Sequence, residues 1–190
     1  GTVGNTAVGY QSAGSMTIGR YNTAVGKHAL ETEGVGDRST AIGYEALHSQ
    51  ASNTNNEITG NTGLGYGAGY FNVTGQNNTY LGYQSGLGAD GQSNSNNTAV
   101  GKDALLDVTD GSQNTAIGGL SAFNITTGDY NTVLGYTALY TSTDVDRTVV
   151  IGAGACAGAM DADADGTVAI GYNSAYRLTS GQYNTIIGYS

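Results

Sequence analysis

The 190-residue sequence lacks proline and tryptophan and contains a single cysteine, Cys156. One cysteine excludes a framework of intrachain disulfides. Charged residues make up only 11% of the chain, and six Lys and Arg against 15 Asp and Glu give a net charge of -9. A nucleic acid or an anionic membrane surface would attract clustered cations, so we expect neither as a partner. No apolar run approaches the roughly 20 residues of a membrane-spanning helix, so we expect no membrane insertion by this segment.

Glycine, in contrast, is abundant. The chain contains 32 Gly, which indicates a backbone that turns often, because Gly adopts positive φ without a steric penalty. Apolar residues make up 38% of the chain and recur at regular positions, together with 14 Tyr. This regularity favours a buried core over a disordered linker.

One glycine recurs at a nearly constant spacing through the whole chain. The eleven repeat glycines are Gly9, Gly26, Gly43, Gly65, Gly82, Gly101, Gly118, Gly135, Gly152, Gly171 and Gly188. The basic spacing is 17 residues, and three units carry insertions of two or five residues. Such a period predicts a solenoid in which each unit forms one coil. We therefore expect residues 1–190 to form a single repeat domain, as a segment of a longer fibrous protein.

Two columns of residues accompany the repeat glycine. Thr stands three residues before it in nine units and Val in two, and a branched aliphatic residue directly precedes it in every unit. The aliphatic column is Val8, Val25, Ile42, Leu64, Leu81, Val100, Ile117, Leu134, Ile151, Ile170 and Ile187. Because alternate residues of a strand face the same side, these two columns share a face. We expect this face to line the inside of the coil and the residue between them to point outward.

The remainder of each unit is also patterned. A small residue follows the repeat glycine by three positions, as in Ala29 and Ala104, and Leu often comes next, as in Leu30 and Leu105. We interpret each unit as a strand, a tight bend, a second short strand and a surface turn. Cys156 occupies the position of these Leu residues, so we expect it in the core.

The residue between the Thr and aliphatic columns is itself apolar, as in Ala116 and Val133. A strand that is apolar on both faces needs two packing partners. One is the interior of its own coil, and the simplest other is a second copy of the chain, which predicts a symmetric homo-oligomer. At about 4.8 Å per coil, eleven units form a rod of roughly 50 Å.

Three segments carry a resemblance to a known family. GTVAIGYNSA (166–175), NTAVGKDAL (97–105) and STAIGYEAL (39–47) resemble the head repeats of trimeric autotransporter adhesins, the YadA-like or Hep/Hag-type family. Related repeats occur in the tail fibres of bacterial viruses. The resemblance implies a left-handed parallel β-roll of three identical chains, located outside the cell or on a virion fibre. It further implies attachment to a host cell, matrix, surface protein or glycan, and it transfers no individual binding residue.

Two other classes of function stay open. An ice-binding solenoid would need an outward Thr ladder, which conflicts with the inward direction expected above. An enzyme such as a fibre-borne depolymerase would need paired carboxylates in a cleft, whereas the Asp residues cluster only at 144–146 and 161–165. His28 and His48 occupy different places in their units, and no catalytic Ser/His/Asp or Cys/His set can be assembled. We therefore expect no catalytic residues and a structural protein rather than an enzyme.

One candidate metal site stands out. The segment DADADG places Asp161, Asp163 and Asp165 at alternate positions before Gly166, as at the start of a calcium loop. The twelfth position of an EF-hand, where a bidentate Glu is expected, holds Tyr172 instead. Calcium binding at these three residues and a solvated acidic turn are the two interpretations left open.

Three further features remain, and the first two have two interpretations each. TVVIGAGACAGA (148–159) is similar to a dinucleotide-binding fingerprint, although the repeat accounts for its glycines and no cofactor is expected. Tyr follows the repeat glycine in seven units, which favours packing between chains over a carbohydrate platform. The five-residue insertion within HSQASNTNNEITG (48–60) is expected to form a specialised surface loop, because insertions in solenoids map to one face and often bind.

Overall fold

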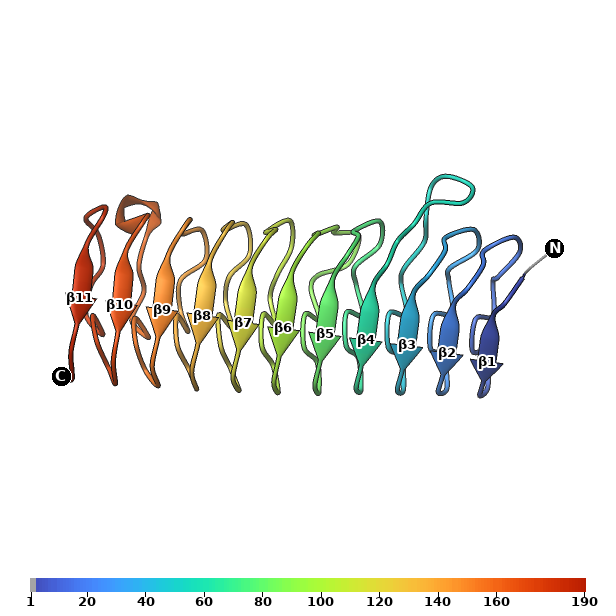
Figure 1. Cartoon of the computed structure of the whole chain (residues 1–190), viewed down its shortest axis with the longest axis horizontal. Helices are drawn as coiled ribbons and strands as arrows, with labels where there is room; N and C mark the ends of the chain where they lie inside the picture. Colours follow the sequence, from blue (N-terminus) through green and yellow to red (C-terminus); the bar gives the residue numbers. More distant parts are fainter. Residues whose placement is uncertain (1–2) are drawn as a thin grey trace.

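The computed structural model describes residues 3–190 and shows eleven coils stacked in a single row (Figure 1). Each coil contributes one strand of three residues to a parallel sheet whose strands follow chain order. The strands are β1 (Thr6–Val8), β2 (Thr23–Val25), β3 (Thr40–Ile42), β4 (Thr62–Leu64), β5 (Thr79–Leu81), β6 (Thr98–Val100), β7 (Thr115–Ile117), β8 (Thr132–Leu134), β9 (Val149–Ile151), β10 (Val168–Ile170) and β11 (Thr185–Ile187); a short 3-10 helix, η1, covers Ala162–Ala164. The predicted all-β class and the parallel β-solenoid of about eleven 17-residue coils are confirmed.

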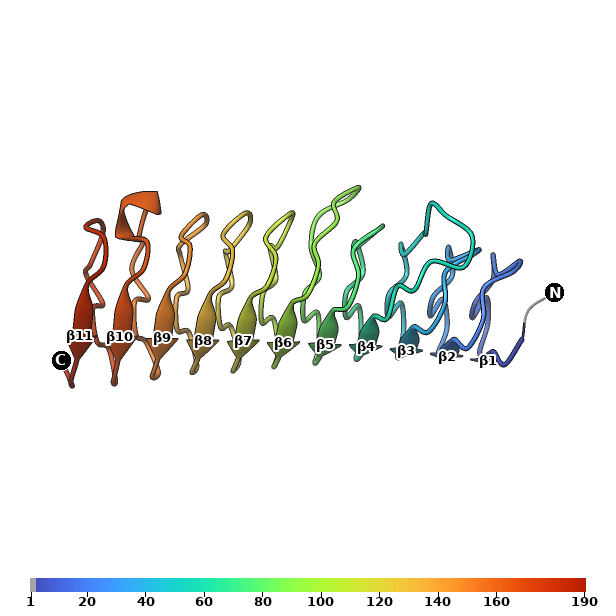
Figure 2. The ribbon, with the colours of Figure 1, turned by 45° about the horizontal axis from the view of Figure 1, so that its top comes forward.

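The register of the sheet follows the repeat without slippage. Each strand position pairs with its own equivalent in the next coil, as in Thr115 with Thr132. The five-residue insertion between β3 and β4 leaves this register intact, because Thr40 still pairs with Thr62. The extra residues are expelled into a loop that rises above its neighbours (Figure 1), and the turned view shows the strands along one side of the stack with the loops opposite (Figure 2).

The repeat glycine is required by the backbone. Gly118 has a φ of +133°, in a region that only glycine adopts readily. A Cβ atom there would lie 2.6 Å from the carbonyl oxygen of Gly135, the equivalent residue of the next coil. The other repeat glycines have φ between +129° and +150°. Conformation and close stacking of the coils therefore both explain why this position never varies within the chain.

The direction of the strand side chains is opposite to the prediction. The middle residue of each strand from β2 to β10 faces the core: Ala116, Val133 and Val150, for example, are fully buried. The aliphatic column, expected inside, faces out, and Val8, Leu64 and Ile117 are 57%, 43% and 41% exposed. The alternation was predicted correctly and its phase was wrong. The reason is the cross-section of the coil, whose interior is already filled by the middle strand residues, the small residues and Leu of the bend, and further apolar residues such as Val108 and Ile125.

The second half of each coil also differs from the prediction. Among residues 3–190 each coil contains one strand, so the expected second strand is absent from the described structure. In its place, residues two and four positions after the repeat glycine adopt left-handed conformations, as Glu45 and Leu47 do with φ of +55° and +49°. A β-strand cannot contain a left-handed residue at every second position. The side chains are nevertheless buried as predicted, because Ala104, Leu105 and Cys156 are fully enclosed.

A buried Asn ladder, which the sequence analysis did not identify, connects the coils. Asn114 donates from Nδ2 to the carbonyl oxygen of Gly128 at 2.8 Å, and its Oδ1 accepts the backbone N–H of Asn131 at 2.9 Å. Equivalent bonds link Asn22, Asn61, Asn78, Asn97 and Asn131 to their neighbours. One Asn side chain thus forms hydrogen bonds with a carbonyl oxygen at a bend and with the backbone N–H of the next coil. Buried backbone groups need such partners.

Candidate binding surfaces

The outer face of the strands forms a continuous surface along the stack. It carries the Thr and aliphatic columns side by side through all eleven coils, and no member of the aliphatic column is buried in the single chain. The Thr residues of adjacent coils pair in register, as do the aliphatic residues. Contiguous apolar surface of this kind marks an interaction site on most proteins.

The tyrosines that follow the repeat glycine stack on one another within the chain. Tyr66 lies between Tyr44 and Tyr83, with ring centroids 5.1 and 5.2 Å away and interplanar angles of 8° and 11°. Tyr172 and Tyr189 stack at 5.2 Å. In these stacks the ring faces are turned toward neighbouring rings, so the stacked tyrosines offer ring edges rather than open faces. Within the chain these five tyrosines therefore pack coil on coil, and packing between chains stays a prediction.

Two histidines that appear unrelated in the sequence meet at one carboxylate. Oε2 of Glu31 lies 2.6 Å from Nδ1 of His28 and 3.0 Å from Nε2 of His48. The ring of His48 stacks on Tyr70 at 4.6 Å. Glu31 and His48 hold the same place in adjacent coils, and comparing equivalent positions between coils would have revealed this contact. Across residues 3–190, however, no group of three or more His, Cys, Asp or Glu side chains is placed to hold a metal ion.

Asp161, Asp163 and Asp165, the predicted calcium ligands, are likewise not placed together as a metal-binding group in the described structure. Oδ1 of Asp161 accepts the backbone N–H of Asp163 at 3.1 Å and caps η1, while the Asp163 side chain is exposed. Oδ1 of Asp165 accepts the backbone N–H of Asp146 at 2.8 Å. Asp165 thereby continues a ladder in which Asp146 and then Asp129 each accept an amide from the preceding coil. The structure gives these oxygens structural hydrogen bonds, and calcium binding stays a prediction.

The predicted specialised loop is anchored by a buried carboxylate. Glu33 is fully buried and accepts hydrogen bonds from Nε2 of Gln50 at 2.9 Å and from Oγ of Ser52 at 2.8 Å. The backbone amides of Val35 and Gly36 donate to it at 2.9 and 2.7 Å. Since Gln50 and Ser52 precede the exposed residues 53–56, this network fixes the base of the loop.

Glu33 makes stability depend on pH. Burial raises the pKa of this carboxyl, but the hydrogen bonds from Gln50, Gly36, Ser52 and Val35 outweigh burial and hold the pKa below its ordinary value of 4.5. A lowered pKa adds stability above the unfolded-state pKa, and this stability is lost as the pH falls through the folded-state value. We expect Glu33→Gln to lower the free energy of unfolding by about 2 kcal/mol at pH 7. The NH2 group that replaces one carboxylate oxygen would face two hydrogen-bond donors and could accept from neither. The difference in the free energy of unfolding between this variant and wild type should become smaller below pH 4.5.

Urea unfolding followed by circular dichroism at pH 7 and at pH 3 measures this difference. Glu57→Gln is the control, because Glu57 belongs to the same loop and is partly exposed. A cost for Glu33→Gln that stays the same at both pH values would contradict the assignment.

The segment similar to a dinucleotide fingerprint belongs to the solenoid. Gly152 is a repeat glycine with φ of +131°, and the only helix that follows in the described chain, η1, has three residues. Burial raises the pKa of the Cys156 thiol to about 12. The thiolate is the reactive form, so a thiol-specific disulfide reagent at pH 8 should leave native Cys156 unmodified and react with it fully in urea. Rapid reaction of the native chain would show that this coil opens locally.

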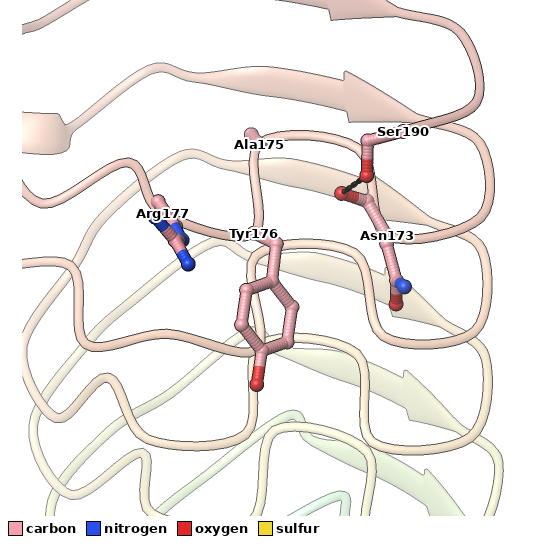
Figure 3. Close-up of a pocket in the computed structure, with 5 residues that line it drawn as sticks. All are labelled: Asn173, Ala175, Tyr176, Arg177 and Ser190. Atoms are coloured by element: carbon pink, nitrogen blue, oxygen red, sulfur yellow. Dashed lines mark hydrogen bonds between the residues drawn. The ribbon is translucent and has the colours of Figure 1, made fainter.

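A hollow of about 380 Å³ lies at the last coil (Figure 3). It is lined by Asn173, Ala175, Tyr176, Arg177 and Ser190, and Oγ of Ser190 donates to the carbonyl oxygen of Asn173 at 2.8 Å. In earlier coils the equivalent backbone is covered by the coil that follows, as when the amide of Leu139 donates to Ala155. The hollow therefore reflects the stacking surface of a coil.

The fold and these surfaces define a β-solenoid repeat protein. Within residues 3–190 no helix is long and apolar enough to cross a membrane. Comparison of the chain with models of known protein families, with curated proteins and with solved structures finds no match.

Proposed function

We propose that this chain is a structural and adhesive segment of a fibre, in which three copies pack through the outer strand face and the lateral surface attaches to a host cell or glycan. The single observation that carries the proposal is the outward aliphatic column, which runs through every coil beside the Thr column and is exposed in six coils and half-buried in the other five. Its exposure costs free energy in water, and covering it with identical chains removes that cost.

Two further considerations support the fibre. A stack of coils grows only in length, and its sides form extended surfaces that suit attachment along the rod. The resemblance of the repeats to adhesin heads and to viral tail fibres favours three chains, left-handed winding and an extracellular or virion location. Both a bacterial surface adhesin and a shaft or receptor-binding segment of a tail fibre fit this proposal.

Light scattering coupled to size-exclusion chromatography tests the assembly. We expect the purified chain to elute at about 58 kDa, three times the 19.2 kDa of one copy. Ile117→Lys places a charge in the centre of the outer face and should yield smaller species, since an unpaired buried charge is costly. Thr143→Lys, on an exposed turn, is the matched control. A folded wild-type monomer would contradict the proposal.

Ice binding is a second candidate, because the structure reverses the argument made against it. The Thr column points outward in an in-register ladder, as a lattice-matching surface requires, although Val149 and Val168 interrupt it in β9 and β10. The column beside it is aliphatic. The face therefore carries about half as many hydroxyl groups as a face with two columns of Thr would carry. A thermal-hysteresis measurement on the same preparation separates the two candidates: hysteresis in a monomer favours ice binding, and a trimer without hysteresis favours the fibre.

A further inference from the structure

A niche of about 190 Å³ opens on the lateral surface of the third to fifth coils. Its floor is Gly67, two positions after the repeat glycine of the fourth coil. Its walls are Glu45, Tyr66, Tyr70, Phe71, Gln84 and Leu87. Glu45 and Gln84 hold the same place as Gly67 in the coils on either side, so they bound the niche along the rod axis.

The backbone does not require glycine at position 67. Its φ is +59°, and the equivalent residues Gln11, Glu45 and Gln84 have φ of +53°, +55° and +50° with full side chains. A Cβ atom on Gly67 would meet Cδ1 of Leu87 at 3.6 Å and Cγ of Gln84 at 3.7 Å, which are ordinary contacts. The glycine at position 67 therefore leaves space at the surface and is not required by the backbone conformation.

The other glycine in this column provides a contrast. A Cβ atom on Gly154 would lie 2.1 Å from Oδ1 of Asn173, so the side chain of the next coil already occupies that space. Gln84 does not fill the space over Gly67 in this way. The absence of a side chain at Gly67 thus leaves a hollow that the chain itself does not close.

The groups around the niche select the chemistry of a ligand. The Glu45 carboxylate accepts hydrogen bonds, and the Gln84 amide both donates and accepts. Burial raises the pKa of Tyr70, and the nearby Glu45, Glu31 and Asp90 raise it further, so its hydroxyl stays protonated as a donor. No Lys or Arg lines the niche, which disfavours an anion.

A cation-π site for an ammonium ligand is also disfavoured. An ammonium group binds over an open aromatic face. Tyr66 lies between Tyr44 and Tyr83, and one face of Tyr70 is stacked on His48. The niche therefore offers hydroxyl groups, ring edges and the apolar surface of Phe71 and Leu87. Such a mixture suits a ring with both hydroxyl groups and C–H faces.

We propose that the niche over Gly67 binds one neutral pyranose unit of a glycan. A volume of about 190 Å³ lies below the usual range for sites of drug-sized ligands and matches a single ring. The inference rests on the proposed attachment function and names its ligand class.

Saturation-transfer NMR on the full chain, with the methyl glycosides of glucose, galactose, mannose and N-acetylglucosamine as probes, tests the proposal. We expect at least one glycoside to bind. Gly67→Gln fills the niche with the side chain that Gln84 carries at the equivalent place, and should weaken binding about tenfold or more. Thr137→Gln, in the same column three coils beyond Gln84, should leave binding unchanged. Glu45→Gln keeps the shape, removes the charged acceptor and should weaken binding several-fold.

Several results would overturn the niche as a sugar site. These are no binding of any glycoside, equal binding by folded Gly67→Gln, or binding of choline in preference to the glycosides. If Gly67→Gln fails to fold, as judged by circular dichroism, unaltered binding by Glu45→Gln overturns the proposal instead. Light scattering on the same samples keeps the two proposals apart: a trimer that binds no glycoside refutes the niche alone, and a monomer that binds one refutes the fibre alone.

Discussion

Replacing Tyr80 by Ala should lower the free energy of unfolding by about 3–5 kcal/mol, the usual cost of emptying a large aromatic site in a core. Tyr80 is fully buried and is the largest such side chain among residues 3–190. It occupies the middle position of β5, where six of the eleven strands carry Ala. Its hydroxyl donates to Oδ1 of Asn94, so the substitution also removes one of the two hydrogen bonds to that oxygen, the other coming from Nδ2 of Asn97.

The ring of Tyr80 fits because nearby residues have no side chain. A Cβ atom on Gly86 would lie 2.2 Å from Cδ1 of Tyr80, and one on Gly69 would lie 2.6 Å from Cδ2. Gly86 holds the place that Leu30 and Leu105 occupy in their coils, with φ of +58° against +52° and +50°. Glycine at this place therefore makes room for the ring and is not needed by the backbone.

This fit predicts a rescue. The double substitution Tyr80→Ala with Gly86→Leu restores the Ala and Leu pair of the second, third and sixth coils, and should recover about 2 kcal/mol of the loss. Gly86→Leu alone should destabilise the chain, because the new side chain collides with Tyr80. Urea unfolding of the four proteins yields the coupling energy directly. If the effects of the two substitutions on the free energy of unfolding are additive, the Tyr80 ring does not depend on the missing side chain at Gly86.

Gly118→Ala should cost about 3 kcal/mol or more. The substitution forces Ala to a φ of +133° and places its Cβ 2.6 Å from the carbonyl oxygen of Gly135. The adjacent residue is a matched control, because a Cβ on Gly119 meets nothing closer than Tyr136 at 3.5 Å. Gly119→Ala should therefore stay within about 0.5 kcal/mol of wild type. Equal thermal stability of the two variants, measured by circular dichroism, would contradict the stacking argument.

The candidate surfaces were predictable only in part. The exposed loop in residues 48–60 followed from the length of its unit, but its anchor, Glu33, did not, because a carboxylate inside a coil contradicts the usual preference of charged groups for water. The contact of His28, Glu31 and His48 and the ladder that includes Asp165 each join adjacent coils. They become visible when equivalent positions of neighbouring units are compared, rather than each unit alone.

The sequence by itself determined the class of fold, the number of coils and the register of the sheet. It does so because a glycine that must adopt a φ near +130° and touch its equivalent in the next coil can occur only once per turn of the solenoid. The tertiary structure decided which strand face is inside. That choice depends on the cross-section of the closed coil, which in the seventh coil holds Ala116 and Ala122 and leaves Ile117 outside. Period and alternation are local properties of a chain, whereas the space inside a coil exists only once the coil has closed.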